Sequence, residues 1–89
     1  MKDRYLEVTF RNGRPLAAYL YLPRVGPEKS VRTQKAGAGL LVDYAADGRP
    51  IGIEITDPLH TSAAALNGVL QSLGQEELRP DEAAPLQAA

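Results

Sequence analysis

The segment from Leu40 to Thr56 (LLVDYAADGRPIGIEIT) constrains the fold most, because it reads as two apolar strands joined by a turn. Its centre, Asp47-Gly48, suits a tight hairpin turn, since glycine tolerates positive φ. An even-numbered loop, either Asp47-Gly48 alone or Ala45 to Gly48, aligns the apolar side chains on one face: Leu40, Val42, Tyr44, Ile51, Ile53 and Ile55. Burying each aliphatic side chain contributes roughly 1.5–3 kcal/mol, so this face is expected to dominate stability.

A second hairpin is predicted near the start of the chain. Residues Tyr5 to Phe10 alternate apolar and polar side chains, and a strand from Leu16 to Leu22 is apolar at every second position. The apolar faces meet only across an odd-numbered loop, so we expect a bulged loop at Arg11-Asn12-Gly13 rather than a strict two-residue turn. The faces that then pair are Leu6, Val8 and Phe10 with Leu16, Ala18, Leu20 and Leu22.

The rest of the chain adds one weak strand and one helix. Ser30 to Lys35 is polar and alternating, which is typical of an edge strand. From Ala63 the apolar spacing becomes helical, with Asp57 or Thr61 as the expected N-cap and Gly74 as the C-cap. The helical positions are Leu66, Val69, Leu70 and Leu73. The sequence therefore predicts an α+β fold, a small antiparallel sheet of about five strands with one C-terminal helix packed on one face.

The domain is expected to span residues 1–75, followed by a flexible tail at 76–89, where no periodicity supports a packed element. With 89 residues, no Cys and one His, neither disulfides nor a Cys/His metal site can brace the thin core, which makes oligomerisation the expected source of further burial. The net charge of −1 supplies no positive field for nucleic acid. The sequence contains no run of 18 or more apolar residues, which a membrane-spanning helix would need. We therefore expect a cytoplasmic protein.

No group of residues shows catalytic spacing. Asp43 and Glu54 share the face opposite the isoleucines and could hold a divalent cation or act as an acid/base pair, but the predicted register staggers them. His60, near Asp57, could act as a base, although a surface or capping role is commoner. We expect no enzyme, cofactor or metal site. A small-ligand or metal-binding protein, or a weak enzyme using the Asp43/Glu54 face, is the alternative.

Two surface features bear on partners. Arg11, Arg14, Arg24 and Lys29 would attract an acidic partner if they clustered at one end of the sheet, but scattered loop charge is the commoner case. Between Pro58 and Gln75 there is no Asp, Glu, Lys or Arg, although a half-exposed helix normally carries several. The small residues on the outer helix face suit a homodimer contact, and a neutral surface is the alternative. The interface candidates are Ala64, Ala65, Gly68 and Ser72 on the helix and Tyr19 and Tyr21 on the second strand.

Two motifs carry a family resemblance: AYLYL at Ala18 to Leu22 and GLLVDYAADGRPIGIEI at Gly39 to Ile55. With these motifs the chain resembles a family of short prokaryotic proteins catalogued as domain of unknown function 2283. The resemblance implies a small antiparallel sheet with a helix and no known activity. Some members are thought to be encoded beside small toxin-like proteins, which implies an antitoxin-like, partner-binding role. We therefore expect a non-enzymatic, homo-oligomeric protein-interaction module, most simply a dimer.

Overall fold

The computed structural model describes residues 4–24 and 26–87. The chain forms five strands, followed by a 3₁₀ turn and two helices. The strands are β1 (Tyr5–Arg11), β2 (Arg14–Tyr21), β3 (Arg32–Gly37), β4 (Leu40–Tyr44) and β5 (Pro50–Ile55). The helical elements are η1 (Pro58–His60), α1 (Ala63–Ser72) and α2 (Pro80–Gln87). Every strand pair is antiparallel, so the predicted α+β class with a five-stranded antiparallel sheet is confirmed.

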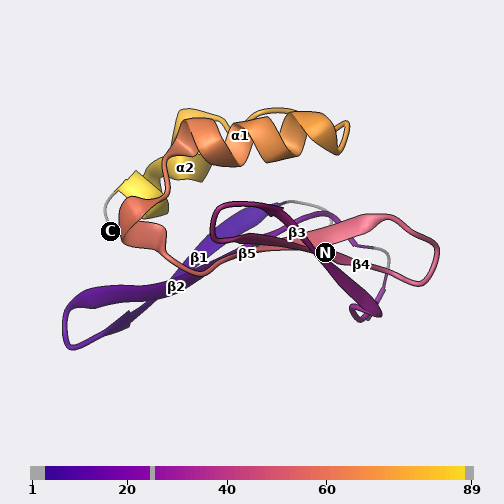
Figure 1. Ribbon diagram of the computed structural model, residues 1–89, viewed down its shortest axis with the longest axis horizontal. Helices are drawn as coiled ribbons and strands as arrows, with labels where there is room; N and C mark the ends of the chain where they lie inside the picture. Colours follow the sequence, from indigo (N-terminus) through magenta and orange to yellow (C-terminus); the bar gives the residue numbers. More distant parts are fainter. Residues whose placement is uncertain (1–3, 25, 88–89) are drawn as a thin grey trace.

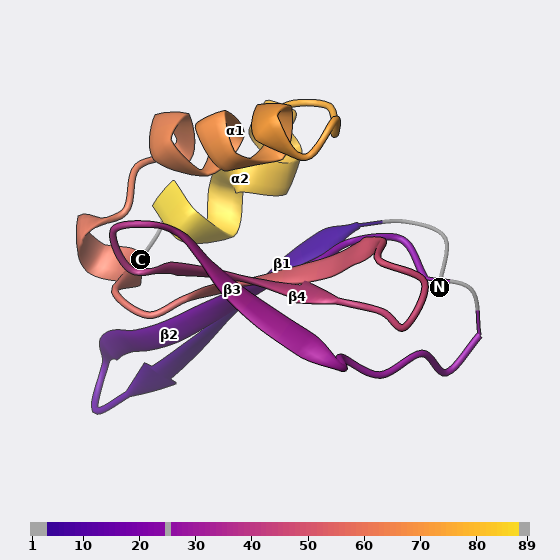
Figure 2. The ribbon, with the colours of Figure 1, turned by 45° about the vertical axis from the view of Figure 1, so that its right-hand side comes forward.

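The strand order is β1-β2-β5-β4-β3, so the two predicted hairpins lie side by side through β2 and β5. The polar strand expected at Ser30 to Lys35 is present as β3, displaced by two residues, and it forms one edge of the sheet. Figure 1 shows α1 and α2 on the same side of the sheet, and the turned view in Figure 2 agrees. The opposite side of the sheet carries no helix of the described residues; we call it the open face.

The core lies between the sheet and the helices. The predicted apolar face of the central hairpin is buried apart from Tyr44, which is half-buried. Side chains from β1, β2, β4 and β5 join those from both helices in one cluster: Leu6, Ala18, Leu20, Leu22, Leu40, Val42, Ile53, Ile55, Leu66, Val69, Leu70 and Leu86.

The first hairpin pairs the predicted faces through a different irregularity. Asn12 (φ 53°) and Gly13 (φ 76°) form a two-residue turn, so the expected three-residue loop is wrong. The odd residue is Leu16 instead, because Phe10 lies opposite Pro15 while Thr9 lies opposite Ala17. This bulge inside β2 restores the parity that the loop lacks. Phe10 and Leu16, predicted for the buried face, remain 51% and 53% exposed where the hairpin extends beyond the helices (Figure 1).

The central hairpin deviates from prediction in the same way. The expected pairs Leu40 with Ile55 and Val42 with Ile53 are present, but Tyr44 lies opposite Pro50. The connection from Ala45 to Arg49 has five residues, so the even-numbered loop is wrong. The register shift next to Tyr44 leaves Ile51 as the extra residue of β5, and its side chain is buried all the same.

Helix α1 follows the predicted helical spacing, but its N-cap is Ser62, whose hydroxyl accepts a hydrogen bond from Ala65 N at 3.0 Å. Asp57, one of the two expected caps, instead precedes η1. Gly74 (φ 73°) ends the helix as predicted. The amide of Gln75 donates to Leu70 O at 2.8 Å and that of Gly74 to Gln71 O at 3.1 Å, which is the Schellman arrangement.

Helix α2 overturns the expectation that residues 76–89 hold no packed element. Ala83 and Leu86 are buried, and α2 packs next to β1. The guanidinium of Arg4 donates to Glu82 Oε2 at 2.8 Å and to the carbonyl oxygens of Glu76 and Glu77 at 2.6 Å each. These bonds tie α2 and the segment before it to the residue that precedes β1.

Candidate functional site

The open face carries two neighbouring rows of polar and aromatic side chains, set by the strand register. One row crosses the sheet as Tyr5, Tyr21, Gly52, Asp43 and Thr33. The other crosses as Glu7, Tyr19, Glu54, Leu41 and Lys35. The structure thus places four of the predicted candidates, Tyr19, Tyr21, Asp43 and Glu54, on this one face.

Tyr19 links the two hairpins across β5. Its hydroxyl donates to Asp43 Oδ2 at 2.7 Å, and Thr33 Oγ1 donates to the other carboxylate oxygen at 2.5 Å. The phenol ring lies directly over Gly52, where a Cβ atom would overlap the ring and its hydroxyl. Burial, followed by the hydrogen bond to Asp43, raises the pKa of the Tyr19 hydroxyl well above its ordinary value. The hydroxyl therefore stays protonated and acts as a hydrogen-bond donor.

Tyr5, Tyr19 and Tyr21 form a contiguous aromatic group, the tyrosine cluster. The rings of Tyr5 and Tyr21 stack with centroids 4.5 Å apart and an interplanar angle of 17°. Tyr19 meets Tyr21 edge-on, with centroids 4.7 Å apart. The Arg24 guanidinium lies 5.5 Å from the Tyr21 centroid, and the Tyr21 hydroxyl donates to Glu7 Oε1 at 3.4 Å. Burial and the charge of Glu7 raise the pKa of Tyr21.

The two carboxylates of the central hairpin lie in neighbouring rows and have different surroundings. Asp43 uses both oxygens for the hydroxyls of Tyr19 and Thr33. Glu54 is half-buried and has no hydrogen bond or ion pair to any described residue. Within residues 4–24 and 26–87, no three His, Cys, Asp or Glu side chains lie close enough to hold a metal ion. Asp43 and Glu54 therefore add two carboxylates to an aromatic surface.

His60 lies in η1 and belongs to neither row of the open face. Its Nδ1 is 3.0 Å from Asp57 Oδ2, and the two side chains are 75% and 57% exposed. The pairing of His60 with Asp57 suggested by their sequence spacing is thus present, at the surface.

The four candidate residues of α1 also lie apart from the tyrosine cluster. Ala64, Ala65, Gly68 and Ser72 are all exposed, on the helix surface that faces away from the sheet. They are therefore accessible in the single chain, and the structure brings none of them to the open face.

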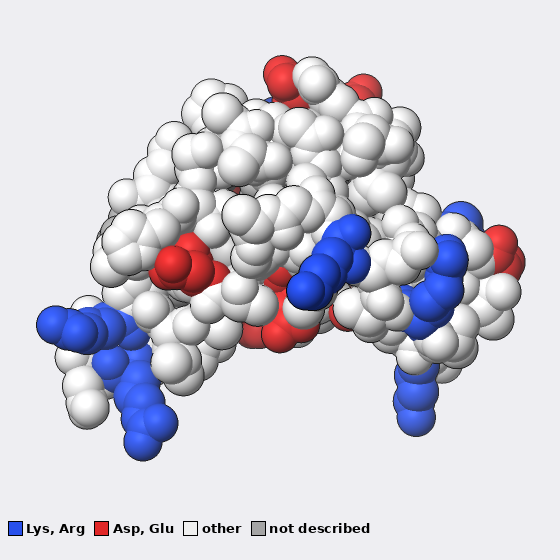
Figure 3. Space-filling model, in the orientation of Figure 1, with Lys and Arg blue, Asp and Glu red and all other residues white. Residues whose placement is uncertain are grey.

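The basic residues separate rather than cluster. Arg11 and Arg14 flank the turn of the first hairpin, whereas Arg24 and Lys29 follow the other end of β2. Figure 3 shows basic side chains gathered at the outer end of the β1–β2 hairpin and acidic side chains beneath the middle of the sheet. The four basic residues therefore do not form one patch.

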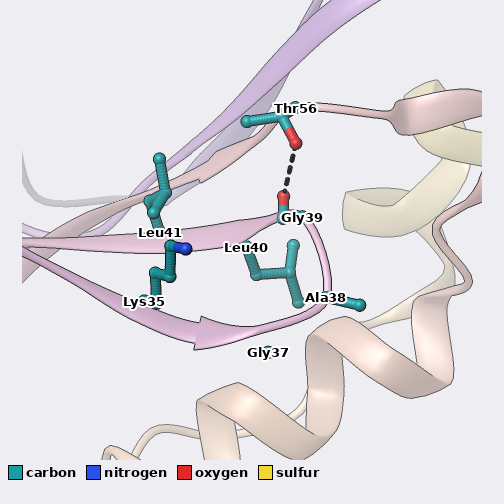
Figure 4. A pocket seen from close by; sticks show the side chains of 7 residues that line it. All are labelled: Lys35, Gly37, Ala38, Gly39, Leu40, Leu41 and Thr56. Carbon is teal, nitrogen blue, oxygen red and sulfur yellow. Dashed lines mark hydrogen bonds between the residues drawn. The ribbon is translucent and has the colours of Figure 1, made fainter.

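A hollow of about 380 Å³ lies at the turn between β3 and β4, and Figure 4 shows the residues around it. Its lining is backbone and aliphatic apart from Lys35 and Thr56, and Thr56 Oγ1 donates to Gly39 O at 3.1 Å. Ala38 and Gly39 form the connection between the two strands. The hollow carries a single titratable side chain, which gives it no acid/base pair.

Sequence reasoning did not name Tyr5, Glu7, Thr33 or Gly52 as candidates for a functional site. The signal for Gly52 was present, because a glycine inside a strand of isoleucines marks the close approach of another group. Tyr5 and Glu7 share the outward parity of the first strand, which alternation alone reveals. The position of Thr33 on this face could be predicted only from the pairing of β3 with β4.

A comparison with known protein families gives a match over part of the chain. Residues 17–57, a little under half of the chain, match the family described as "Protein of unknown function (DUF2283)". No match was found among curated proteins or among solved structures. Neither α1 nor α2 is long and apolar enough to cross a lipid bilayer, and the described residues form no other helix that is. The resemblance to the family of unknown function DUF2283 is therefore confirmed over residues 17–57, from within β2 to just beyond β5.

Proposed function

We propose that this protein is a non-enzymatic protein-interaction module that binds another protein through its open face. The observation that supports this proposal is the tyrosine cluster, in which Tyr21 contacts the rings of both Tyr5 and Tyr19, on a sheet face that no helix of the described residues covers. Tyrosines combine a large apolar ring with a polar end and are enriched in protein interfaces. Tyr5 is 45% exposed, so one face of the stack is accessible.

The tyrosine cluster is suited to binding rather than to catalysis because it is held in place beforehand. Tyr19 is held by its hydrogen bond to Asp43 and by its close approach to Gly52, and Tyr21 contacts both the ring of Tyr5 and the guanidinium of Arg24. A prearranged surface loses less side-chain entropy on association. The raised pKa of Tyr19 opposes formation of a phenolate nucleophile near neutral pH.

The proposal includes homo-oligomerisation. The small core is the physical reason, because a second subunit would bury further apolar surface. The outer face of α1, with Gly68 and three other small residues, stays a candidate contact. The family resemblance suggests a more specific version of this function, in which the protein acts like an antitoxin. In that form, the protein bound at the open face is a small toxin-like neighbour.

Site-specific photo-crosslinking tests the proposal. A benzophenone amino acid replaces Tyr5 on the open face or, as a control of similar exposure, Leu59 in η1, which is 60% exposed. Irradiation in cells that express the protein should give a discrete protein adduct from position 5 and none from position 59.

The opposite outcome would favour the alternative. If position 5 gives no adduct, and divalent cations or metabolites raise the melting temperature of the wild type but not of Glu54→Gln, the open face binds a small ligand. The protein-interaction proposal would then be wrong.

A further inference from the structure

We propose that the open face binds a second copy of this chain, in a two-fold arrangement that sets Arg11 and Arg14 of each protomer against Glu7 and Glu54 of the other. This inference rests on the proposed function, because it names the protein that occupies the open face. It also places the dimer contact on the sheet rather than on α1.

The first observation is a pair of positive charges, at the turn end of the β1–β2 hairpin, that has no acidic partner among the described residues. Arg11 and Arg14 lie directly opposite each other in the β1–β2 register, and like charges in that position destabilise a strand pair by a few tenths of a kcal/mol to roughly 1 kcal/mol. Neither guanidinium has a hydrogen bond, ion pair or ring contact to a described residue. Each of the other five arginines has one: Arg4 with Glu82, Arg24 with Ile51 O, Arg32 with the Tyr44 ring, Arg49 with Asp47 and Arg79 with Asp81.

The second observation is the matching acidic group on the same face. Glu7 and Glu54 lie on either side of Tyr19 in one row of the register. Glu54 is half-buried without a partner among the described residues, and Glu7 has only the long hydrogen bond from Tyr21. A carboxylate that loses water on association needs a charged or hydrogen-bonding partner. An arginine from another chain supplies both the charge and the donors.

The spacing of the two groups makes the face self-complementary. Glu7, Thr9 and Arg11 occupy successive outward positions of β1, so the acidic and basic ends are four residues, or about 13 Å, apart. A two-fold axis between the facing sheets, running across the strands level with Thr9 and Ala17, brings each basic end onto the partner's acidic end. Thr9 and Ala17 pair with each other, and their small side chains let the sheets approach at this level. Such an isologous contact closes a dimer.

The view of Figure 3 agrees with this arrangement. The basic side chains at the end of the β1–β2 hairpin and the acidic side chains beneath the sheet lie on the side opposite the helices. Asp43 does not compete for the arginines, because its two oxygens already accept hydrogen bonds from Tyr19 and Thr33. Glu7 and Glu54 are thus the carboxylates of this face that remain to be paired.

Charge reversal followed by mixing tests the inference. Sedimentation velocity should show a dimer for the wild type and monomers for the double variants Arg11→Glu/Arg14→Glu and Glu7→Arg/Glu54→Arg. An equimolar mixture of the two variants should form a dimer again, because each supplies the complement of the other. Gly68→Arg on α1 is the matched control and should leave the wild-type dimer intact.

Milder variants keep the test valid if a reversal prevents folding, as judged by loss of a cooperative melt. Arg11→Gln/Arg14→Gln and Glu7→Gln/Glu54→Gln should each raise the dimer Kd about tenfold or more, and raised salt should do the same to the wild type.

Two results would overturn the inference. One is a dimer that Gly68→Arg disrupts and the charge variants do not, which would place the contact on α1. The other is a wild type that stays monomeric at all concentrations while position 5 crosslinks to a different protein. That second result leaves the proposed function standing, whereas a monomer without any crosslinked protein contradicts both.

Discussion

Replacing Gly52 with alanine probes the geometry of the open face most directly. Tyr19 lies so close over Gly52 that a Cβ atom there would overlap the ring and its hydroxyl. The added methyl group must therefore push the Tyr19 side chain away from the sheet. This movement separates Tyr19 from Asp43 and from the edge-on contact with Tyr21.

The expected loss follows from the interactions that Tyr19 makes. A hydrogen bond to a charged group contributes about 1.5–3 kcal/mol, and an aromatic pair adds about 0.5–1.5 kcal/mol. Asp43 is only half-buried and keeps its bond from Thr33, so the lower part of these ranges applies. Replacing glycine by alanine inside a strand raises the free energy of unfolding by about 0.5–1 kcal/mol. Gly52→Ala should therefore lower the free energy of unfolding by about 1–2 kcal/mol.

A double-mutant cycle measured by urea unfolding gives the test. In a Tyr19→Ala background the ring is absent, so Gly52→Ala should be neutral or stabilise by up to about 1 kcal/mol. In the wild-type background the same change should lower the melting temperature by about 4–8 °C per kcal/mol. Equal destabilisation in both backgrounds would refute the reasoning, because the clash would then involve a group other than Tyr19.

Two further predictions concern the core and the Arg4–Glu82 pair. Ile53 is fully buried, so Ile53→Asp should cost more than about 4 kcal/mol and abolish the cooperative melt; a normally melting variant would refute the face assignment. The Arg4 hydrogen bond holds the pKa of Glu82 below its ordinary value of 4.5, so Glu82 adds stability above that pH and loses it as pH falls through the folded-state pKa. As the pH is lowered, the free energy of unfolding should therefore fall more steeply for the wild type than for Glu82→Gln. Identical curves of unfolding free energy against pH would contradict this contribution.

Strand parity made the faces of both hairpins predictable, because the apolar side chains on each strand must share the buried side. The same parity argument did not locate the irregular residues. It required an odd residue in the first hairpin but placed it in the loop rather than at Leu16 inside β2. Sequence alternation counts the extra residue without distinguishing a bulged loop from a bulged strand.

The open face could not be assembled from the sequence because its parts come from strands that are not neighbours in the chain. The sequence places Asp43 on the face opposite the isoleucines and Tyr19 on the second strand, but their hydrogen bond depends on β2 lying next to β5. Local alternation gives no information on strand order. A contact across three strands therefore needs the tertiary fold.

Helix α2 was missed for a related reason. Its apolar pattern is short, with Ala83 and Leu86 as the buried positions, and Pro85 argues against a helix. A local start signal was nevertheless present, since Pro80 precedes two acidic residues in the first turn. The helix is also held by the hydrogen bond from the Arg4 guanidinium to Glu82. A local sequence pattern near residue 80 cannot reveal a partner at residue 4.

The Arg4–Glu82 pair also has a consequence for how the protein is made. The two residues are 78 positions apart, so their bond cannot form until almost all of the intervening chain has left the ribosome. At about 5–20 residues per second, β1 is synthesised roughly 4 to 16 s before its partner in α2. During that interval the apolar face of the nascent β1–β2 hairpin lacks the helices that cover it in the folded protein, and in this period the nascent chain would depend most on chaperones.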